Sequence, residues 1–137
     1  MQEQIFIDTG FVVALKNTRD SYHKQALELA IKYQNSFFIT TDAVLLEIGN
    51  GLSRNYKQEA IQVIEEFISL ETVEIVELTP ELFIEAFRVY KIYQDKQWGL
   101  VDCLSFVVMW DRNISEVLTF DRHFIQAGFT ILTNIIE

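Results

Sequence analysis

The sequence predicts an α/β fold, a three-layer α/β/α sandwich around a central, mostly parallel sheet of four or five strands. Short apolar segments alternate along the chain with longer segments whose apolar residues recur at the helical period. The first apolar segment, residues 4–8, ends on an acid, Asp8. In sheets of this kind ligand sites lie beyond the carboxyl ends of the strands, so Asp8 falls where a site is expected.

The composition predicts one domain that spans residues 1–137. Half of the 137 residues are hydrophobic, which is enough for a substantial core. The one Pro and the five Gly are scattered along the chain, so no linker or low-complexity stretch divides it. The sequence shows no internal repeat.

Cysteine usage and the apolar segments predict a soluble, cytoplasmic protein. Cys103 is the only cysteine, which excludes an intrachain disulfide and a cysteine zinc cluster and suits a reducing compartment. The start, MQEQIFI, lacks the features of a signal peptide. The longest apolar run, CLSFVVMW, is much shorter than the roughly 18 residues that a membrane span needs.

The first third of the chain predicts two strands and two helices. Residues 4–8 form a short apolar strand, and residues 36–40 form a second one. Between them a helix begins at Ser21, which suits an N-cap. The apolar face of that helix consists of Tyr22, Ala26, Leu29, Ala30 and Tyr33. Hydroxyls and an acid at 40–42 begin the next helix, which ends near Arg54.

The middle of the chain predicts a helix over 58–70, a short strand over 73–76 and a further helix. The segment Thr79-Pro80-Glu81 opens this last helix with a hydroxyl cap and a proline at the first helical position. Its apolar face consists of Leu82, Phe83, Ala86, Phe87, Tyr90 and Tyr93.

The last third predicts a buried helix followed by short elements. The helix over 99–111 is apolar on most sides, so we expect it to be covered on most sides. Residues 117–120 form a strand, Asp121 precedes a short helical turn, and residues 129–132 form an edge strand.

Four acids stand in apolar or small-residue surroundings, unlike most of the twenty, and each has a purely structural alternative. Asp8 and Asp121 follow apolar strands, where Asp can serve as an N-cap. Asp102 is the third residue after Gly99, where an acid can accept a hydrogen bond from the cap amide. Glu47 lies on a helix among apolar and small residues, and as an edge residue it could reach solvent.

Taken together, the four acids predict a cation site. Two of them end parallel strands and two lie on helices that begin at the same edge, so the fold brings them together. Carboxylates in close contact raise one another's pKa, and a divalent cation relieves that repulsion. Oxygen ligands favour Mg²⁺ or Mn²⁺ over zinc, and such sites commonly serve phosphoryl chemistry.

The same residues carry a resemblance to a known family. The segments FIDTGFVVAL, LLEIGNGL, WGLVDCLSFVVM and VLTFDRHF resemble, in order and over nearly the whole chain, the motifs of PIN-domain ribonucleases. The nearest likeness is to the small VapC-type toxins of toxin–antitoxin pairs. The resemblance implies a PIN-like sandwich that cleaves RNA phosphodiesters by metal-activated water, with Mg²⁺ as cofactor and Mn²⁺ as a substitute.

The resemblance also assigns roles. Asp8, Glu47, Asp102 and Asp121 occupy the positions of the family's catalytic acidic quartet, with Asp8 and Asp102 as the most direct metal ligands. Thr9 and Thr119 match hydroxyl positions that orient carboxylates or water. Relatives often carry Ser or Thr where this chain has Gly99, which affects local rigidity rather than chemistry. We expect both histidines, His23 and His123, to lie outside the chemistry.

The resemblance implies three partners: an RNA substrate, an antitoxin protein with a basic inhibitory segment, and a second copy of the chain. RNA must approach a protein whose formal net charge is −9. Phosphate contacts are therefore expected from a few cations, each of which could equally be an ordinary solvated side chain. They are Arg54, Lys57, Lys96, Arg112 and Arg122.

Other functions remain open on the residues alone. A receiver-like phosphotransfer domain needs paired acids after the first strand or a late lysine, yet no lysine follows Lys96. A phosphatase of the dehalogenase type needs an acid where Gly10 stands. A non-catalytic interaction module with the PIN fold is the third alternative, and the four retained acids disfavour it.

Overall fold

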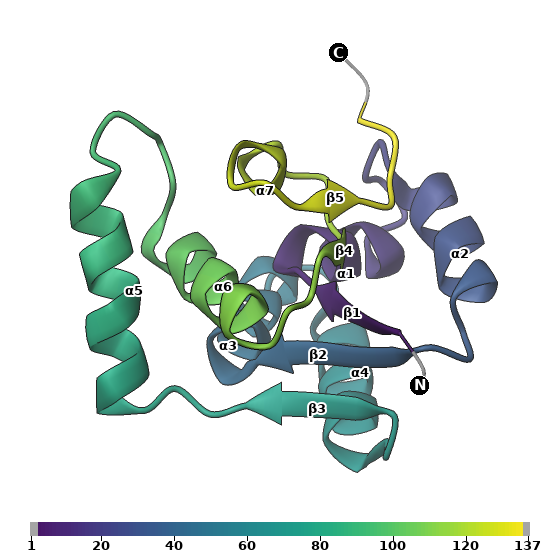
Figure 1. Cartoon of the computed structure of the whole chain (residues 1–137). Helices are drawn as coiled ribbons and strands as arrows, with labels where there is room; N and C mark the ends of the chain where they lie inside the picture. The colour runs from purple at the N-terminus through teal and green to yellow at the C-terminus, as the bar shows by residue number, and fades with distance from the viewer. Residues whose placement is uncertain (1–2, 136–137) are drawn as a thin grey trace.

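A parallel sheet of five strands runs through the centre of the computed structural model, which describes residues 3–135 (Figure 1). The strand order is β3-β2-β1-β4-β5, and every neighbouring pair is parallel. The strands are β1 (Gln4–Ile7), β2 (Phe37–Thr41), β3 (Val73–Val76), β4 (Glu116–Leu118) and β5 (Thr130–Ile131). The predicted α/β/α class with a parallel sheet is confirmed.

Helices cover both faces of the sheet. They are α1 (Thr9–Lys16), α2 (His23–Lys32), α3 (Asp42–Leu52), α4 (Lys57–Ser69), α5 (Pro80–Ile92), α6 (Leu100–Asp111) and α7 (His123–Gln126). α1 packs on α2 and α3, and α3 packs on α4, whereas α6 packs on α5 and α7. Right-handed crossovers explain the division, because the chain moves one way from β1 to β3 and the other way from β3 to β5.

The reversal of strand order places a crevice between β1 and β4. β1 pairs with β2 on one side and with β4 on the other, and Ile7 pairs with Leu118 at the end of both strands. The backbone N–H of Asp8 then donates to the carbonyl of Leu118 at 3.1 Å. The residues that follow β1 and β4 therefore emerge side by side, where parallel sheets bind ligands.

The core centres on α6, whose residues 103–109 are all buried, as its uniformly apolar sequence predicts. Phe106 is fully buried, and its ring contacts the rings of Trp98, Trp110, Phe124 and Phe129. Cys103 is a buried free thiol within the same helix.

Two of the predicted helix starts are confirmed in atomic detail. The hydroxyl of Thr41 accepts from the N–H of Val44 at 3.1 Å, and that of Thr79 accepts from the N–H of Leu82 at 3.1 Å. Pro80 occupies the start of α5.

Other predicted boundaries are wrong by a few residues. α2 begins at His23 with Tyr22 as its cap residue, rather than with Ser21, because the carboxylate of Asp20 accepts from the N–H of Tyr22 and holds a turn there. The fourth strand spans Glu116–Leu118 rather than 117–120, because Thr119 leaves the sheet to bond to Asp8. The short edge strand β5 lies within the predicted 129–132. Among residues 3–135, none of the helices combines the length and apolarity that crossing a bilayer requires.

The aromatic core predicts a large stability difference between two helix positions. Phe106→Ala should lower the free energy of unfolding by about 3–5 kcal/mol, because it removes a fully buried ring. Ile31→Ala on α2, where the residue is 67% exposed, should change it by less than about 0.5 kcal/mol. Urea unfolding followed by circular dichroism measures both, and equal losses would contradict this description of the core.

Candidate active site

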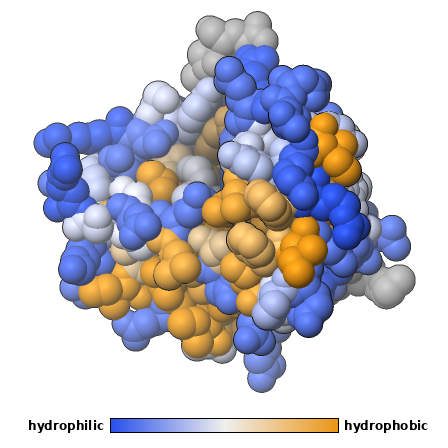
Figure 2. Space-filling model, turned by 90° about the vertical axis from the view of Figure 1, so that its left-hand side faces the viewer, coloured by the Kyte–Doolittle hydropathy of each residue, from blue (hydrophilic) through white to orange (hydrophobic). Residues whose placement is uncertain are grey.

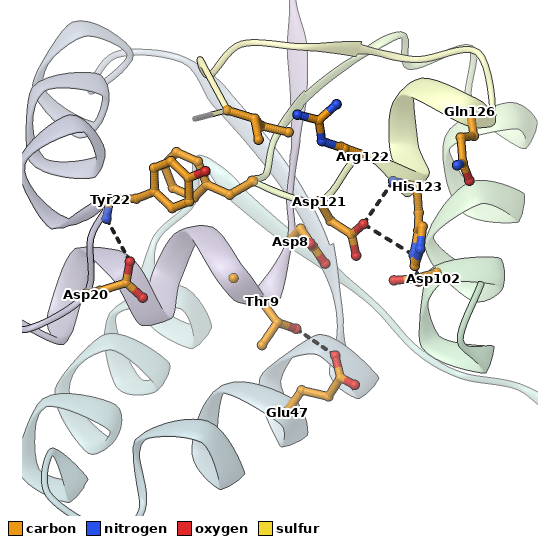
Figure 3. A pocket seen from close by; sticks show the side chains of 13 residues that line it. Asp8, Thr9, Asp20, Tyr22, Glu47, Asp102, Asp121, Arg122, His123 and Gln126 are labelled. Atoms are coloured by element: carbon orange, nitrogen blue, oxygen red, sulfur yellow. Dashed lines mark hydrogen bonds and ion pairs between the residues drawn. The ribbon is translucent and has the colours of Figure 1, made fainter. Parts of the chain in front are cut away.

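An open pocket of about 700 Å³ lies at the carboxyl ends of β1 and β4 (Figure 3). All four acids singled out in the sequence line it, and they come from four different segments of the chain: Asp8, Glu47, Asp102 and Asp121. The remaining lining residues are Thr9, Gly10, Asp20, Tyr22, Phe120, Arg122, His123, Gln126 and Ile135. The predicted convergence of the acids is therefore what the structure shows.

Asp8 is the most deeply buried acid of the pocket, with 6% of its surface exposed. It precedes α1 at the N-cap position, yet among the described residues its carboxylate forms no capping bond with that helix. The carboxylate instead accepts a hydrogen bond of 2.7 Å from the hydroxyl of Thr119. The structural alternative, that Asp8 serves as an N-cap, is thus wrong for its side chain.

Burial raises the pKa of Asp8 to about 7. Loss of hydration is the main cause, and the hydrogen bond from Thr119 offsets part of it. The negative charges of Asp102 and Asp121 raise the pKa further. At neutral pH this carboxyl group therefore holds a proton for much of the time unless a positive charge is nearby.

Asp102 combines a capping role with a place in the pocket. The N–H of Gly99 donates to its Oδ2 at 3.1 Å, as the sequence alternative proposed. The same oxygen lies 3.0 Å from Nδ1 of His123. Burial raises the pKa of Asp102, the contact with His123 lowers it, and the charge of Asp121 raises it again.

Asp121 is held by the turn that follows β4. Its N–H donates to the hydroxyl of Thr119 at 3.0 Å, and its Oδ1 accepts from the N–H of His123 at 2.8 Å. Thr119 therefore links Asp8 to Asp121, since one hydroxyl donates to the first and accepts from the second. The capping alternative for Asp121 is correct in part, because its carboxylate does bond to the first amide of α7.

Glu47 lies across the pocket on α3. Its Oε1 accepts a hydrogen bond of 2.8 Å from the hydroxyl of Thr9, which holds the carboxylate toward the other acids (Figure 3). The residue is exposed, so it is the acid of the four with the freest access to water.

His123 is the site residue that sequence reasoning missed. Its Nδ1 lies 3.0 Å from Oδ2 of Asp102 and 3.2 Å from Oδ1 of Asp121, so the ring is placed between two of the four acids. The signal was its position two residues after Asp121, because an Asx-type turn there brings the side chain back over the carboxylate.

The cations expected to meet RNA are mostly elsewhere. Arg122 alone of the five lines the pocket among residues 3–135. Arg112 pairs with Glu74 at 2.7 Å, and Lys96 lies 3.4 Å from Asp95. Trp98 is buried, and its indole N–H donates to the side chain of Gln126, so its role is packing.

The donor set fits a divalent cation. Asp102, Asp121 and His123 each offer one ligand atom, and these atoms lie within 4.8 Å of one another. Asp8 adjoins them with a carboxyl group whose pKa is raised, mainly by burial and further by the charges of Asp102 and Asp121. Carboxylate oxygens predominate, which suits Mg²⁺ or Mn²⁺.

The comparisons with known proteins agree with this geometry. The pattern of the family described as PIN domain matches residues 5–130. This chain belongs to the PIN domain family. Within the family, it is 33% identical over 126 residues to the 23S rRNA-specific endonuclease VapC20 of Mycobacterium tuberculosis, covering 91% of this chain and 95% of that one. The predicted likeness to VapC-type proteins is thereby confirmed.

Solved structures of PIN domain proteins share the fold. The crystal structure of Mycobacterium tuberculosis VapC20, a toxin that cleaves the sarcin–ricin loop, superimposes with a TM-score of 0.85 at 26% identity, covering 95% of this chain and 99% of that one. VapBC2 of Rickettsia felis, bound to a DNA fragment from its promoter, gives 0.63 at 19% identity, covering 93% and 96%. DNA-bound VapBC of Salmonella typhimurium gives 0.62 at 16% identity, covering 96% and 97%. These last two show the fold alone.

The buried Asp8 predicts how the metal-free protein responds to pH. Its folded pKa of about 7 exceeds the ordinary value of 3.8, so the folded state binds the proton more tightly than the unfolded state. Stability is then highest below pH 4 with respect to this group and is lost as pH rises to about 7, by roughly 4 kcal/mol at most. Asp8→Asn should abolish this loss and be more stable than wild type at pH 8 in EDTA.

Chemical denaturation from pH 4 to pH 8 in EDTA measures this difference. Asp95→Asn is the matched control, because its side chain is 70% exposed and the substitution should leave the wild-type pH profile unchanged. If the free energy of unfolding changes equally with pH in Asp8→Asn and in wild type over the whole range, the raised pKa of the buried Asp8 carboxyl group is refuted.

Proposed function

We propose that this chain is a Mg²⁺-dependent endoribonuclease and the toxin of a toxin–antitoxin pair. The observation that carries the proposal is the convergence of four carboxylates on one open pocket at the reversal point of the sheet. A passive RNA-binding surface would gain nothing from four acids, because they repel phosphates. Acids that hold a divalent cation attract the same phosphates.

Some residues of the chain are proposed to hold the cation, and others orient the carboxylates that hold it. Asp8 and Asp102 are the proposed direct ligands of the cation, and Asp121 and Glu47 complete its surroundings. When bound, Mg²⁺ supplies a water acidic enough to act as a nucleophile near neutral pH and neutralises charge at the scissile phosphate. Thr119 and Thr9 keep two of the carboxylates in orientation through their hydrogen bonds.

The substrate proposed first is ribosomal RNA. It rests on the VapC20 relative, which is named for its action on 23S rRNA. Arg122 lies at the pocket and is the cation best placed for a phosphate. The pocket is also lined by the stacked rings of Tyr22 and Phe120, whose centroids are 4.2 Å apart.

An antitoxin is the proposed protein partner. The resemblance to VapC-type toxins implies such a partner, and the two solved VapBC structures that share the fold are bound to DNA. A pocket with four acids and a protein of net charge −9 suit a basic inhibitory segment, whose Arg could pair with the carboxylates and exclude the cation.

A second copy of the chain is proposed to cover α5. Figure 2 views the α5 side of the molecule and shows hydrophobic residues gathered over much of it. Phe83, Phe87 and Tyr90 form a row of stacked rings along the helix, and each is more than 40% exposed. Ile84 and Ile92 extend the apolar surface with 58% and 65% exposure. Monomers rarely expose so large an apolar face, which supports a homodimer.

The nuclease proposal predicts metal-dependent cleavage. Wild type with Mg²⁺ should cut a labelled 23S rRNA fragment, and EDTA should abolish the cut. Asp8→Asn and Asp102→Asn should lower the rate at least about 100-fold, because each removes a negative ligand. Asp111→Asn, an exposed acid at the end of the same helix as Asp102, is the matched control and should keep full activity. Equal cleavage by wild type and both site variants would show a contaminant and refute the proposal.

If the chain is a homodimer, one substitution on α5 should halve the mass of the protein measured in solution. Phe87→Arg should convert a dimer into a folded monomer, because it places a charge in the apolar face of α5. Ile31→Arg on α2, where the side chain is 67% exposed, should leave the mass unchanged. Size-exclusion chromatography with light scattering distinguishes the two states. A wild-type monomer at micromolar concentration, or a dimer unaffected by Phe87→Arg, would rule out this interface.

A further inference from the structure

His123 faces the cation site in the geometry of a ligand. Its Nδ1 is 3.0 Å from Oδ2 of Asp102 and 3.2 Å from Oδ1 of Asp121. Adjacent ligand atoms of an octahedral cation with bonds of 2.0–2.1 Å are separated by about 3 Å. The Nδ1 atom of His123 therefore lies from each of these two oxygens at the spacing of neighbouring corners in a coordination shell.

The position of the ring is fixed by the chain. His123 is the first residue of α7, and its N–H is bonded to the carboxylate of Asp121 at 2.8 Å. Its side chain is only 26% exposed, so the ring is enclosed by the pocket wall rather than free in solvent. The carboxylate of Asp102 accepts from the N–H of Gly99, the residue before α6. Main-chain N–H groups at the starts of α6 and α7 therefore hold the two carboxylates that flank the ring.

We propose that His123 contributes a nitrogen ligand to the cation site and gives it a preference for Mn²⁺ over Mg²⁺. Mg²⁺ takes oxygen ligands almost exclusively, whereas imidazole nitrogen is a good ligand for first-row transition metals. A site of carboxylates alone distinguishes these two ions weakly. Replacing one oxygen by the Nδ1 of His123 strengthens binding of Mn²⁺ and adds little for Mg²⁺. The inference rests on the proposed function, because it assumes that the pocket holds a divalent cation.

The chain has only two histidines, so a signal from an imidazole nitrogen can be assigned with two substitutions. His23 does not line the pocket, and its Nδ1 lies 2.8 Å from the carbonyl oxygen of Ala14. In the Mn²⁺-loaded protein, pulsed electron paramagnetic resonance should detect the ¹⁴N nucleus of a directly bound imidazole. His123→Gln should lose that signal, and His23→Gln, the matched control, should retain it.

Calorimetry without RNA supplies the second readout. His123→Gln should weaken Mn²⁺ binding by at least about 10-fold and change Mg²⁺ binding by less than about threefold, so the preference for Mn²⁺ collapses. Thermal melting of each variant in EDTA confirms that it is folded. Absence of the ¹⁴N signal in wild type, or equal changes for both ions, would overturn the assignment of His123.

Asp102→Asn separates the failure of this inference from failure of the proposed function. If Asp102→Asn abolishes Mn²⁺ binding while His123→Gln binds both ions as wild type does, the cation site stands and His123 is only a hydrogen-bond partner. If Asp102→Asn also binds Mn²⁺ as wild type does, the pocket is not the cation site, and both the proposed function and the role of His123 are refuted.

Discussion

The structure depends on one unfavourable interaction, a carboxyl group buried at the end of the central strand. Asp8 follows β1 in the middle of the sheet. Its N–H is bonded to the carbonyl of Leu118, and the residue is nearly inaccessible to solvent. Two further carboxylates, Asp102 and Asp121, lie close enough to raise its pKa. A fold optimised for stability alone would not keep such a group, because burial of an uncompensated charge is costly. A bound cation would offset this cost.

The fold positions the other carboxylates of the pocket around Asp8 through specific hydrogen bonds. The reversal of strand order brings the ends of β1 and β4 together, and one hydroxyl, Thr119, joins the acids that follow them. The opposite helical layers each bring one further acid, Glu47 from α3 and Asp102 from α6. Each of these is bonded to a neighbour, Thr9 or Gly99, which limits its motion. The positions of these carboxylates are thus set by hydrogen bonds within the chain.

The sequence alone was sufficient for the class of fold and for the four acids, and insufficient for their contacts. Helical and strand periodicities report burial directly, so the layers and the buried α6 were predictable, as were the caps Thr41 and Thr79. The start of α2 was missed because Asp20 and Ser21 are both good turn residues, and it is the carboxylate of Asp20 that accepts from the N–H of Tyr22 and forms the turn. His123 was missed for a related reason. A histidine in a polar turn is ordinarily a surface residue, and its contact with Asp102 depends on how α6 and α7 pack.

This chain belongs to the PIN domain family, and four acids that are distant in its sequence line one pocket. The most direct measurement is anomalous diffraction from crystals of the protein soaked in Mn²⁺. If the four acids form one cation site, we expect a strong anomalous peak in the pocket, within bonding distance of oxygens from Asp8 and Asp102 and close to Asp121. A pocket without a peak, with those carboxylates turned away from one another, would contradict it.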